Sequence, residues 1–252
     1  MEPLQQMPFL LLITSLIVLW FSAWIGVKLH KPGALQGEDR EEFGIVLGAA
    51  LTLLGLIIGF TFSMAVTRYD QRKNLEEEEA NAIGTEYVRA DLLPAASAAD
   101  VQVLLTKYLA QRILFYETRD PRELERINSV TSQLQAELWS AIKGPALAQQ
   151  TPVVALAVSG MNDVLNSQGY TQAAWLNRIP PAAWVLMAII AICANVLLGY
   201  GWHQSKGKTF LLVVMPLLLA VSFFLVADID SPRRGLIRVI PQNLLSLKQS
   251  LH

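Results

Sequence analysis

The sequence predicts an all-α, polytopic membrane protein with four transmembrane helices and a helical extramembrane domain between spans 2 and 3. Hydrophobic residues make up 53% of the 252 residues and charged residues only 16%, whereas soluble domains carry about a quarter charged residues. Four apolar runs without Asp, Glu, Lys or Arg are each long enough to cross a hydrocarbon core of about 30 Å. No segment has the strict apolar–polar alternation of a strand.

The four predicted spans divide the chain into two transmembrane hairpins. The spans cover about residues 9–27, 44–66, 182–202 and 209–227. The first run is a poor secretory signal, because no positive charge precedes it and no small-residue cleavage site follows it, so we expect it to remain as an anchor. The predicted parts are the first hairpin at 1–66, the extramembrane domain at 67–180, the second hairpin at 181–227, and a polar turn with an amphipathic C-terminal tail at 228–252.

The extramembrane domain begins as a continuation of the second span. No helix breaker follows that span, so we expect one helix from 44 to about 93, ending at Pro94. The acidic run Glu76–Glu79 within it is interpreted as a solvated face, which is the usual role of a charge run.

Further helices are predicted after Pro94. An amphipathic helix follows it directly, and Asp120-Pro121 begins the next one, with Asp as N-cap and Pro at the first helical position. We expect Gly144-Pro145 to break the chain before a helix at about 146–167. After the fourth span, Ser231 as N-cap and Pro232 predict a short helix.

The sequence offers no constellation for catalysis or for a cofactor. It lacks the zinc-protease, nucleophile-elbow and phosphate-loop motifs, and its single cysteine, Cys193, lies in an apolar run where one thiol forms no metal site. The net charge of -1 argues against a nucleic-acid partner. We therefore expect no enzyme activity, no cofactor and no metal site.

The predicted spans contain no ionisable side chain, which argues against a pump or an ion-coupled carrier. A channel with an apolar constriction is compatible with such spans. The second span carries two G-x-x-x-G pairs, which would let helix backbones approach closely. These glycines could equally be a packing face with no further function. They are Gly44, Gly48, Gly55 and Gly59.

One stripe of the second span is a candidate pore lining. Thr52, Leu56 and Phe60 are spaced i, i+4 and i+8, which places them on one helix face. The same spacing is typical of a core or of a lipid-facing surface, so the residues alone leave these alternatives open.

Several phrases of the chain resemble the bacterial bestrophin-like family of membrane proteins, which is distantly similar to the bestrophin anion channels. Residues 57–69 resemble the second transmembrane helix of bestrophins, where a Gly-Phe pair precedes Thr-Arg and an aromatic residue. Residues 228–235 resemble the acidic, Pro- and Gly-containing turn after the last bestrophin span. Phrases close to those of the bacterial family are Gly59–Ser63, Glu79–Thr85, Arg89–Pro94 and Asp230–Gly235.

The resemblance implies a homopentamer whose subunits each contribute the second helix to a central pore with an apolar neck. It places Thr52, Leu56 and Phe60 at the neck; Phe60 matches the family's aromatic residue, whereas the other two depart from isoleucine and phenylalanine and imply a wider or wetter neck. Arg68 matches an arginine at the end of the pore helix, where it would attract anions or, equally, anchor the helix at the interface. The corresponding post-membrane turn comprises Asp228, Asp230, Pro232, Arg233, Arg234 and Gly235. No calcium site is expected after it.

Two functions remain in competition. The leading prediction is a homo-oligomeric, anion-conducting ion channel for ions such as chloride, pentameric if bestrophin-like; its partners would be the lipid bilayer, inorganic anions and further copies of itself. The alternative is a non-conducting membrane sensor or scaffold with a four-helix extramembrane domain. The resemblance implies a protein of the bacterial cytoplasmic (inner) membrane, and basic residues near the span ends predict that domain 67–180 and both termini lie in the cytoplasm.

Overall fold

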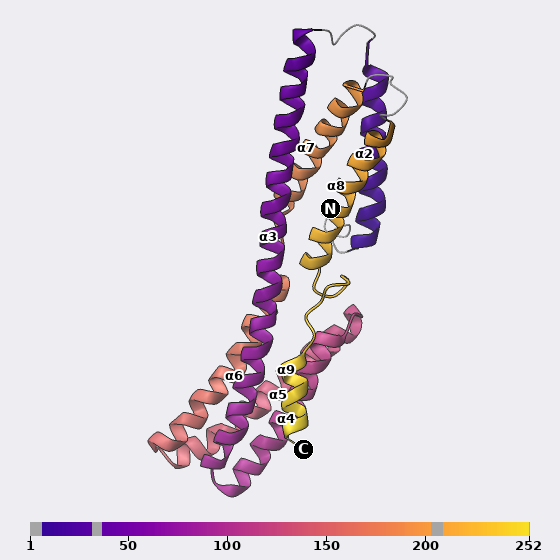
Figure 1. Ribbon diagram of the computed structural model, residues 1–252. Coiled ribbons are helices and arrows are strands. Elements are labelled where there is room, and N and C mark those ends of the chain that lie inside the picture. The colour runs from indigo at the N-terminus through magenta and orange to yellow at the C-terminus, as the bar shows by residue number, and fades with distance from the viewer. Residues whose placement is uncertain (1–6, 32–36, 203–208, 252) are drawn as a thin grey trace. The chain divides into compact units, whose positions relative to one another are not determined.

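The computed structural model describes residues 7–31, 37–202 and 209–251, and within these ranges it contains helices and no strand (Figure 1). Four helical segments among them are long and apolar enough to cross a membrane, and their apolar parts lie in α2, α3, α7 and α8. This confirms the predicted all-α fold with four spans. The elements are α2 (Pro8–Leu29), α3 (Glu38–Arg89), η1 (Ala90–Leu92), α4 (Ala95–Glu117), α5 (Pro121–Ala148), α6 (Pro152–Leu176), α7 (Pro181–Tyr200), α8 (Thr209–Asp230) and α9 (Gln242–Ser250).

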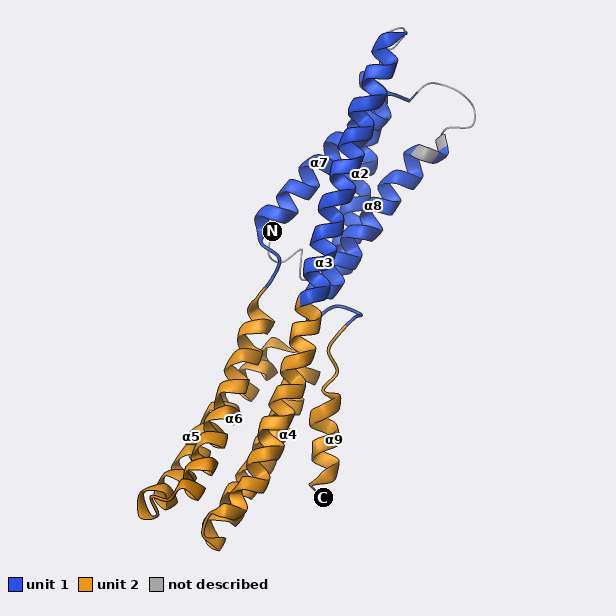
Figure 2. Cartoon of the chain, turned by 60° about the vertical axis from the view of Figure 1, so that its left-hand side comes forward, with its two compact units in different colours: residues 1–67, 178–237 blue, residues 68–177, 238–252 orange. Residues whose placement is uncertain are grey.

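The chain forms two compact units, which are described separately (Figure 2). Unit 1 comprises residues 1–67 and 178–237, and unit 2 comprises residues 68–177 and 238–252. Helix α3 contributes its apolar part to unit 1 and its charged part to unit 2.

Unit 1 is held together by a very close contact between α2 and α7. A Cβ built on Gly26 would lie 2.0 Å from the carbonyl oxygen of Val196, and one built on Gly199 would lie 1.9 Å from the carbonyl oxygen of Ala23. The two helix backbones therefore touch where only glycine fits, which is the way small residues pack membrane helices. Helix α8 also packs against α2.

Unit 2 has an apolar core built from helical stripes. Helices α4, α5 and α6 each bury residues at intervals of three and four, so that each turns one face inward. Burial of each large side chain contributes about 1.5–3 kcal/mol. The core includes Val101, Leu105 and Leu109 of α4, Ile127, Leu134 and Leu138 of α5, Val154, Met161 and Val164 of α6, and Leu244 of α9.

The predicted break at Gly144-Pro145 is wrong, although the start at Asp120 is confirmed. Helix α5 continues to Ala148 with Pro145 inside its last turn, where the missing N–H removes a single helical hydrogen bond. The next helix begins at Pro152 rather than at about 146, because the Thr151 hydroxyl accepts a hydrogen bond from the backbone N–H of Val154 and caps it.

Candidate functional site

The three predicted neck residues lie on an exposed face of α3. Leu56 is 53% exposed and Phe60 is 62% exposed, and Thr52 is exposed as well. The Thr52 hydroxyl donates a hydrogen bond to the carbonyl oxygen of Gly48 in its own helix, at 2.9 Å. Its hydrogen-bond donor therefore needs no partner on a neighbouring helix. Little of this part of α3 is buried, and its buried residues, Leu54, Thr61 and Ala65, lie on the other side of the helix.

The four glycines of the second span also face open space. A Cβ built on Gly44, Gly48, Gly55 or Gly59 would meet nothing within 4 Å. Among the described residues no other helix lies against these glycines, so a role in helix packing requires a second molecule and stays a prediction. The glycines that do pack closely, Gly26 and Gly199, were not singled out by their sequence spacing.

Arg68, the candidate for attracting anions, is the first residue of unit 2 and is half-buried. Neither its role toward anions nor its role as an interface anchor is tested by this position.

The post-membrane turn is organised by the buried carboxylate of Asp228, which is 1% exposed. Its two oxygens accept hydrogen bonds from the backbone N–H groups of Leu236 and Ile237, at 2.7 and 2.8 Å. A Cβ on Gly235 would lie 2.2 Å from the carbonyl oxygen of Asp228, so the chain folds back closely over the end of α8. The predicted short helix at Ser231-Pro232 is therefore wrong: the segment is a turn whose N–H groups bind a side chain instead of helical carbonyls.

Asp230 joins the end of α8 to the start of α7 within unit 1. Its carboxylate accepts from the backbone N–H of Ile179 at 3.2 and 3.3 Å, and its carbonyl oxygen accepts from Arg178 Nη1 at 3.4 Å. In the same turn Pro232 is buried, Arg233 is half-buried and Arg234 is exposed. The acidic residues of this turn thus bind backbone N–H groups, and no group of three or more His, Cys, Asp or Glu that could hold a metal occurs in the part of the chain that the structure describes.

A row of buried charged residues on α3 was missed by the sequence reasoning. Arg72, Glu76, Glu79 and Glu86 are each at most 1% exposed, and we call them the polar seam. The prediction that the acidic run is solvated holds for Glu77 and Glu78 but is wrong for Glu76 and Glu79. Their intervals of three and four residues are the signal that they share one inward face.

The centre of the polar seam is an ion pair between Glu79 and Arg112 of α4, with both side chains 0% exposed. The hydroxyls of Tyr116 and Thr171 also donate to Glu79 Oε2, at 3.3 and 3.2 Å. Burial alone would lower the pKa of Arg112, but the Glu79 carboxylate beside it raises that pKa. Burial, followed by the charge of Glu79, raises the pKa of Tyr108 and Tyr116. The arginine is therefore charged and both phenols are neutral.

Two further members of the polar seam, Glu76 and Arg72, bind other helices of unit 2. Glu76 accepts from the backbone N–H of Leu244 at 2.9 Å and from Asn243 Nδ2 at 2.7 Å, which attaches α9 to α3. Arg72 donates to the carbonyl oxygens of Ala174 and Asn177 at the end of α6, at 3.2 Å each. The polar seam thus holds unit 2 together and has the character of a structural network.

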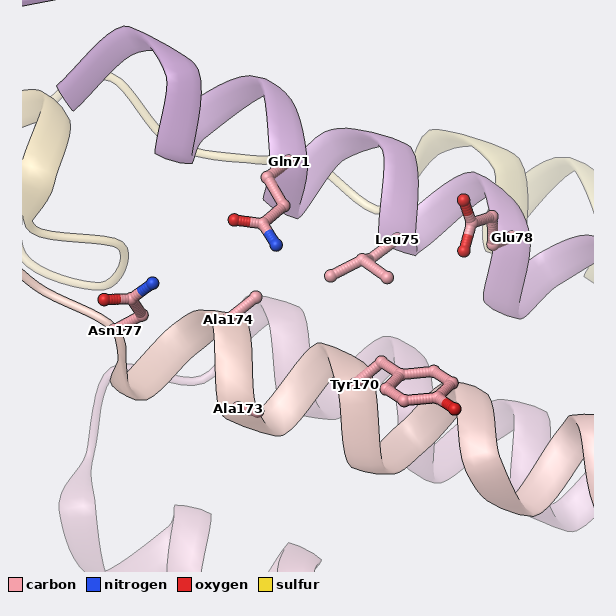
Figure 3. A pocket seen from close by; sticks show the side chains of 7 residues that line it. All are labelled: Gln71, Leu75, Glu78, Tyr170, Ala173, Ala174 and Asn177. Atoms are coloured by element: carbon pink, nitrogen blue, oxygen red, sulfur yellow. The ribbon is translucent and has the colours of Figure 1, made fainter. Parts of the chain in front are cut away.

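A pocket of about 400 Å³ lies between α3 and α6 in unit 2. Figure 3 shows Gln71, Leu75 and Glu78 on α3 opposite Tyr170 of α6 and Asn177, which directly follows α6. None of the predicted site residues lines this pocket.

The four long apolar helices define a polytopic helical membrane protein. The model of the Bestrophin-like domain matches residues 11–244, nearly the whole chain, so the protein belongs to the bestrophin-like family. No curated protein matches the sequence.

Solved structures support the same fold. A crystal structure of a bacterial bestrophin homologue from Klebsiella pneumoniae has a TM-score of 0.64 and 15% sequence identity, over 94% of this chain and 98% of that chain. A point variant of the Klebsiella pneumoniae homologue has a TM-score of 0.66 and 14% identity, over 94% of this chain and 97% of the other. The predicted bestrophin-like fold is thereby confirmed.

Proposed function

We propose that the chain assembles into a homo-oligomeric ion channel that conducts anions such as chloride along a central pore lined by α3. The observation that carries this proposal is the exposed face of α3, where Thr52, Leu56 and Phe60 are uncovered in the single chain. A membrane helix whose surface is mostly uncovered in the single chain has room for lipid, for a neighbouring subunit or for a pore. The family resemblance favours the pore, with a pentamer as the assembly.

The chemistry of this face suits an ion path with an apolar neck. Leu56 and Phe60 form an apolar ring when repeated around a symmetry axis, and such a ring gates by wetting. Thr52 contributes a hydroxyl one turn earlier and makes the neck more polar there. Arg68, just beyond the apolar part of α3, adds a positive charge that favours anions.

Replacing Phe60 with alanine is expected to raise chloride flux severalfold, because removal of the ring widens and wets the neck. Chloride efflux from liposomes containing the purified protein measures the effect. Phe21→Ala is the matched control, since Phe21 is 51% exposed on α2 and should leave the flux unchanged. A monomeric protein that passes no chloride would overturn the proposal in favour of the sensor or scaffold.

The proposed orientation places domain 67–180 and both termini in the cytoplasm of a bacterial inner membrane. Ser97→Cys, in a Cys193→Ser background, should resist a membrane-impermeant thiol reagent in intact cells and react after lysis. Ser97 is half-buried on α4, so reaction after lysis is the internal control. Labelling of intact cells would place the domain outside and favour the sensor.

A further inference from the structure

Glu86 is the member of the polar seam whose carboxyl group makes no hydrogen bond to the described residues. Its side chain is 0% exposed, and neither carboxyl oxygen has a hydrogen-bond partner among the described residues. The carboxyl group lies against α6, because a Cβ built on Gly160 would be 2.0 Å from Glu86 Oε2. The space left by the absent side chain of Gly160 holds this carboxyl group and also Arg89 Nη1, which would lie 2.7 Å from the same Cβ.

Two charged side chains near Glu86, Arg89 and Asp163, act on it in opposite directions. Arg89 lies one turn further along α3, and its Nη1 is 4.0 Å from Oδ2 of Asp163 on α6, with the two side chains 34% and 66% exposed. Asp91 of η1 is exposed and accepts from Gln102 Nε2 of α4 at 2.9 Å. Burial raises the pKa of Glu86 to about 8; Arg89 opposes this shift and Asp163 adds to it. Glu86 is therefore mostly protonated at neutral pH.

We propose that Glu86 is a proton-controlled contact between α3 and α6: the neutral acid allows α6 to pack on it at Gly160, and its ionisation loosens α6 there. An ionised carboxylate without hydrogen bonds is too costly to keep buried, so the charged group must reach water. Opening of α6 around Gly160 supplies that water. This inference concerns unit 2 alone and does not depend on ion conduction.

The direction of the pH dependence follows from proton linkage. The pKa of Glu86 is about 8 in the packed state, against 4.5 for the ordinary side chain. Between pH 4.5 and about 8, Glu86 is therefore protonated in the packed state and ionised in the open state. The stabilisation is complete below the lower value and is lost as pH rises toward the higher one. With one proton involved, the opening constant of α6 should rise by up to about tenfold per pH unit in this window and level off above it.

Hydrogen exchange of the full chain in detergent tests this dependence. Protection factors of the α6 amides around Met161, corrected for the intrinsic effect of pH on exchange, should fall with rising pH in the wild type. Glu86→Gln keeps the shape but cannot ionise, so its profile should be flat. Glu78→Gln is the matched control, because Glu78 is an exposed carboxylate on the same helix, and it should keep the wild-type profile.

Infrared spectroscopy supplies an independent readout of the proton itself. The carbonyl stretch of a protonated carboxylic acid should disappear on alkaline titration of the wild type and be missing in Glu86→Gln. If Glu86→Gln does not fold, Asp163→Asn serves instead, because it removes a charge that raises the pKa of Glu86. The loss of the infrared band and the fall in α6 protection should then both occur at lower pH than in the wild type. A band that titrates without any change in α6 protection would overturn the proposal, and so would identical pH profiles in the wild type and Glu86→Gln.

Discussion

Arg112→Met is expected to lower the free energy of unfolding by about 3–5 kcal/mol, because it leaves Glu79 as an uncompensated buried charge. The hydroxyls of Tyr116 and Thr171 remain near Glu79, but two neutral hydrogen bonds replace only part of what the guanidinium supplies. Denaturant unfolding of the full chain in detergent, followed by circular dichroism, measures the loss. Phenol absorbance gives a second signal, since Tyr108 and Tyr116 lie in the same cluster.

Two comparisons make this result specific. Arg126 forms an ion pair with Glu123 on the exposed surface of α5, and Arg126→Met should leave the unfolding curve unchanged because solvated pairs contribute little. The double variant Glu79→Leu, Arg112→Met should recover part of the lost stability, because no buried charge remains. A wild-type unfolding curve for Arg112→Met alone would contradict the structural role of the pair.

Gly199→Ala is expected to destabilise unit 1 by about 3 kcal/mol, the upper end of the usual cost of overpacking. The added Cβ would lie 1.9 Å from the carbonyl oxygen of Ala23. That obstacle is helix backbone and cannot move aside as a flexible side chain would, so α2 and α7 must separate. Loss of the helical signal on heating in detergent is the measurement.

Gly55→Ala provides the matched control in another predicted span. A Cβ at Gly55 meets nothing within 4 Å in the single chain, so this variant should keep the thermal stability of the chain. If a second copy packs at Gly55, the variant should change assembly size on a sizing column instead. Equal melting of the two variants would contradict the close α2–α7 contact.

Local sequence signals predicted some of the helix ends of unit 2 and missed others. Asp120 was predicted as an N-cap and does accept a hydrogen bond from the backbone N–H of Arg122 at 3.0 Å. Pro145 was misread because a proline near a helix end removes only one bond, and the stronger start signal, Thr151-Pro152, was overlooked. The similar pattern Ser231-Pro232 starts no helix, because the Asp228 carboxylate binds the backbone N–H groups of Leu236 and Ile237 and holds the segment as a turn.

The polar seam was beyond the reach of local reasoning. Its intervals along α3 indicate an inward face, but charge argued for solvent, and the deciding partner, Arg112, lies on another helix. For the predicted neck residues the limit is different. Their spacing predicts that they share one helix face, but a pore forms only when several copies of the chain surround an axis. Thr52, Leu56 and Phe60 therefore stay predictions until the assembled protein is studied.

The attachment of α9 through Glu76 has a consequence for biosynthesis. Glu76 and Leu244 are separated by 168 positions along the chain, and the ribosome makes the second hairpin between them. Until residues 243 and 244 emerge, the carboxylate of Glu76 lacks these hydrogen bonds and the core of unit 2 lacks Leu244. Closing so long a loop is slow. The second hairpin is therefore synthesised before unit 2 can be completed, and until then the unit lacks one of its helices.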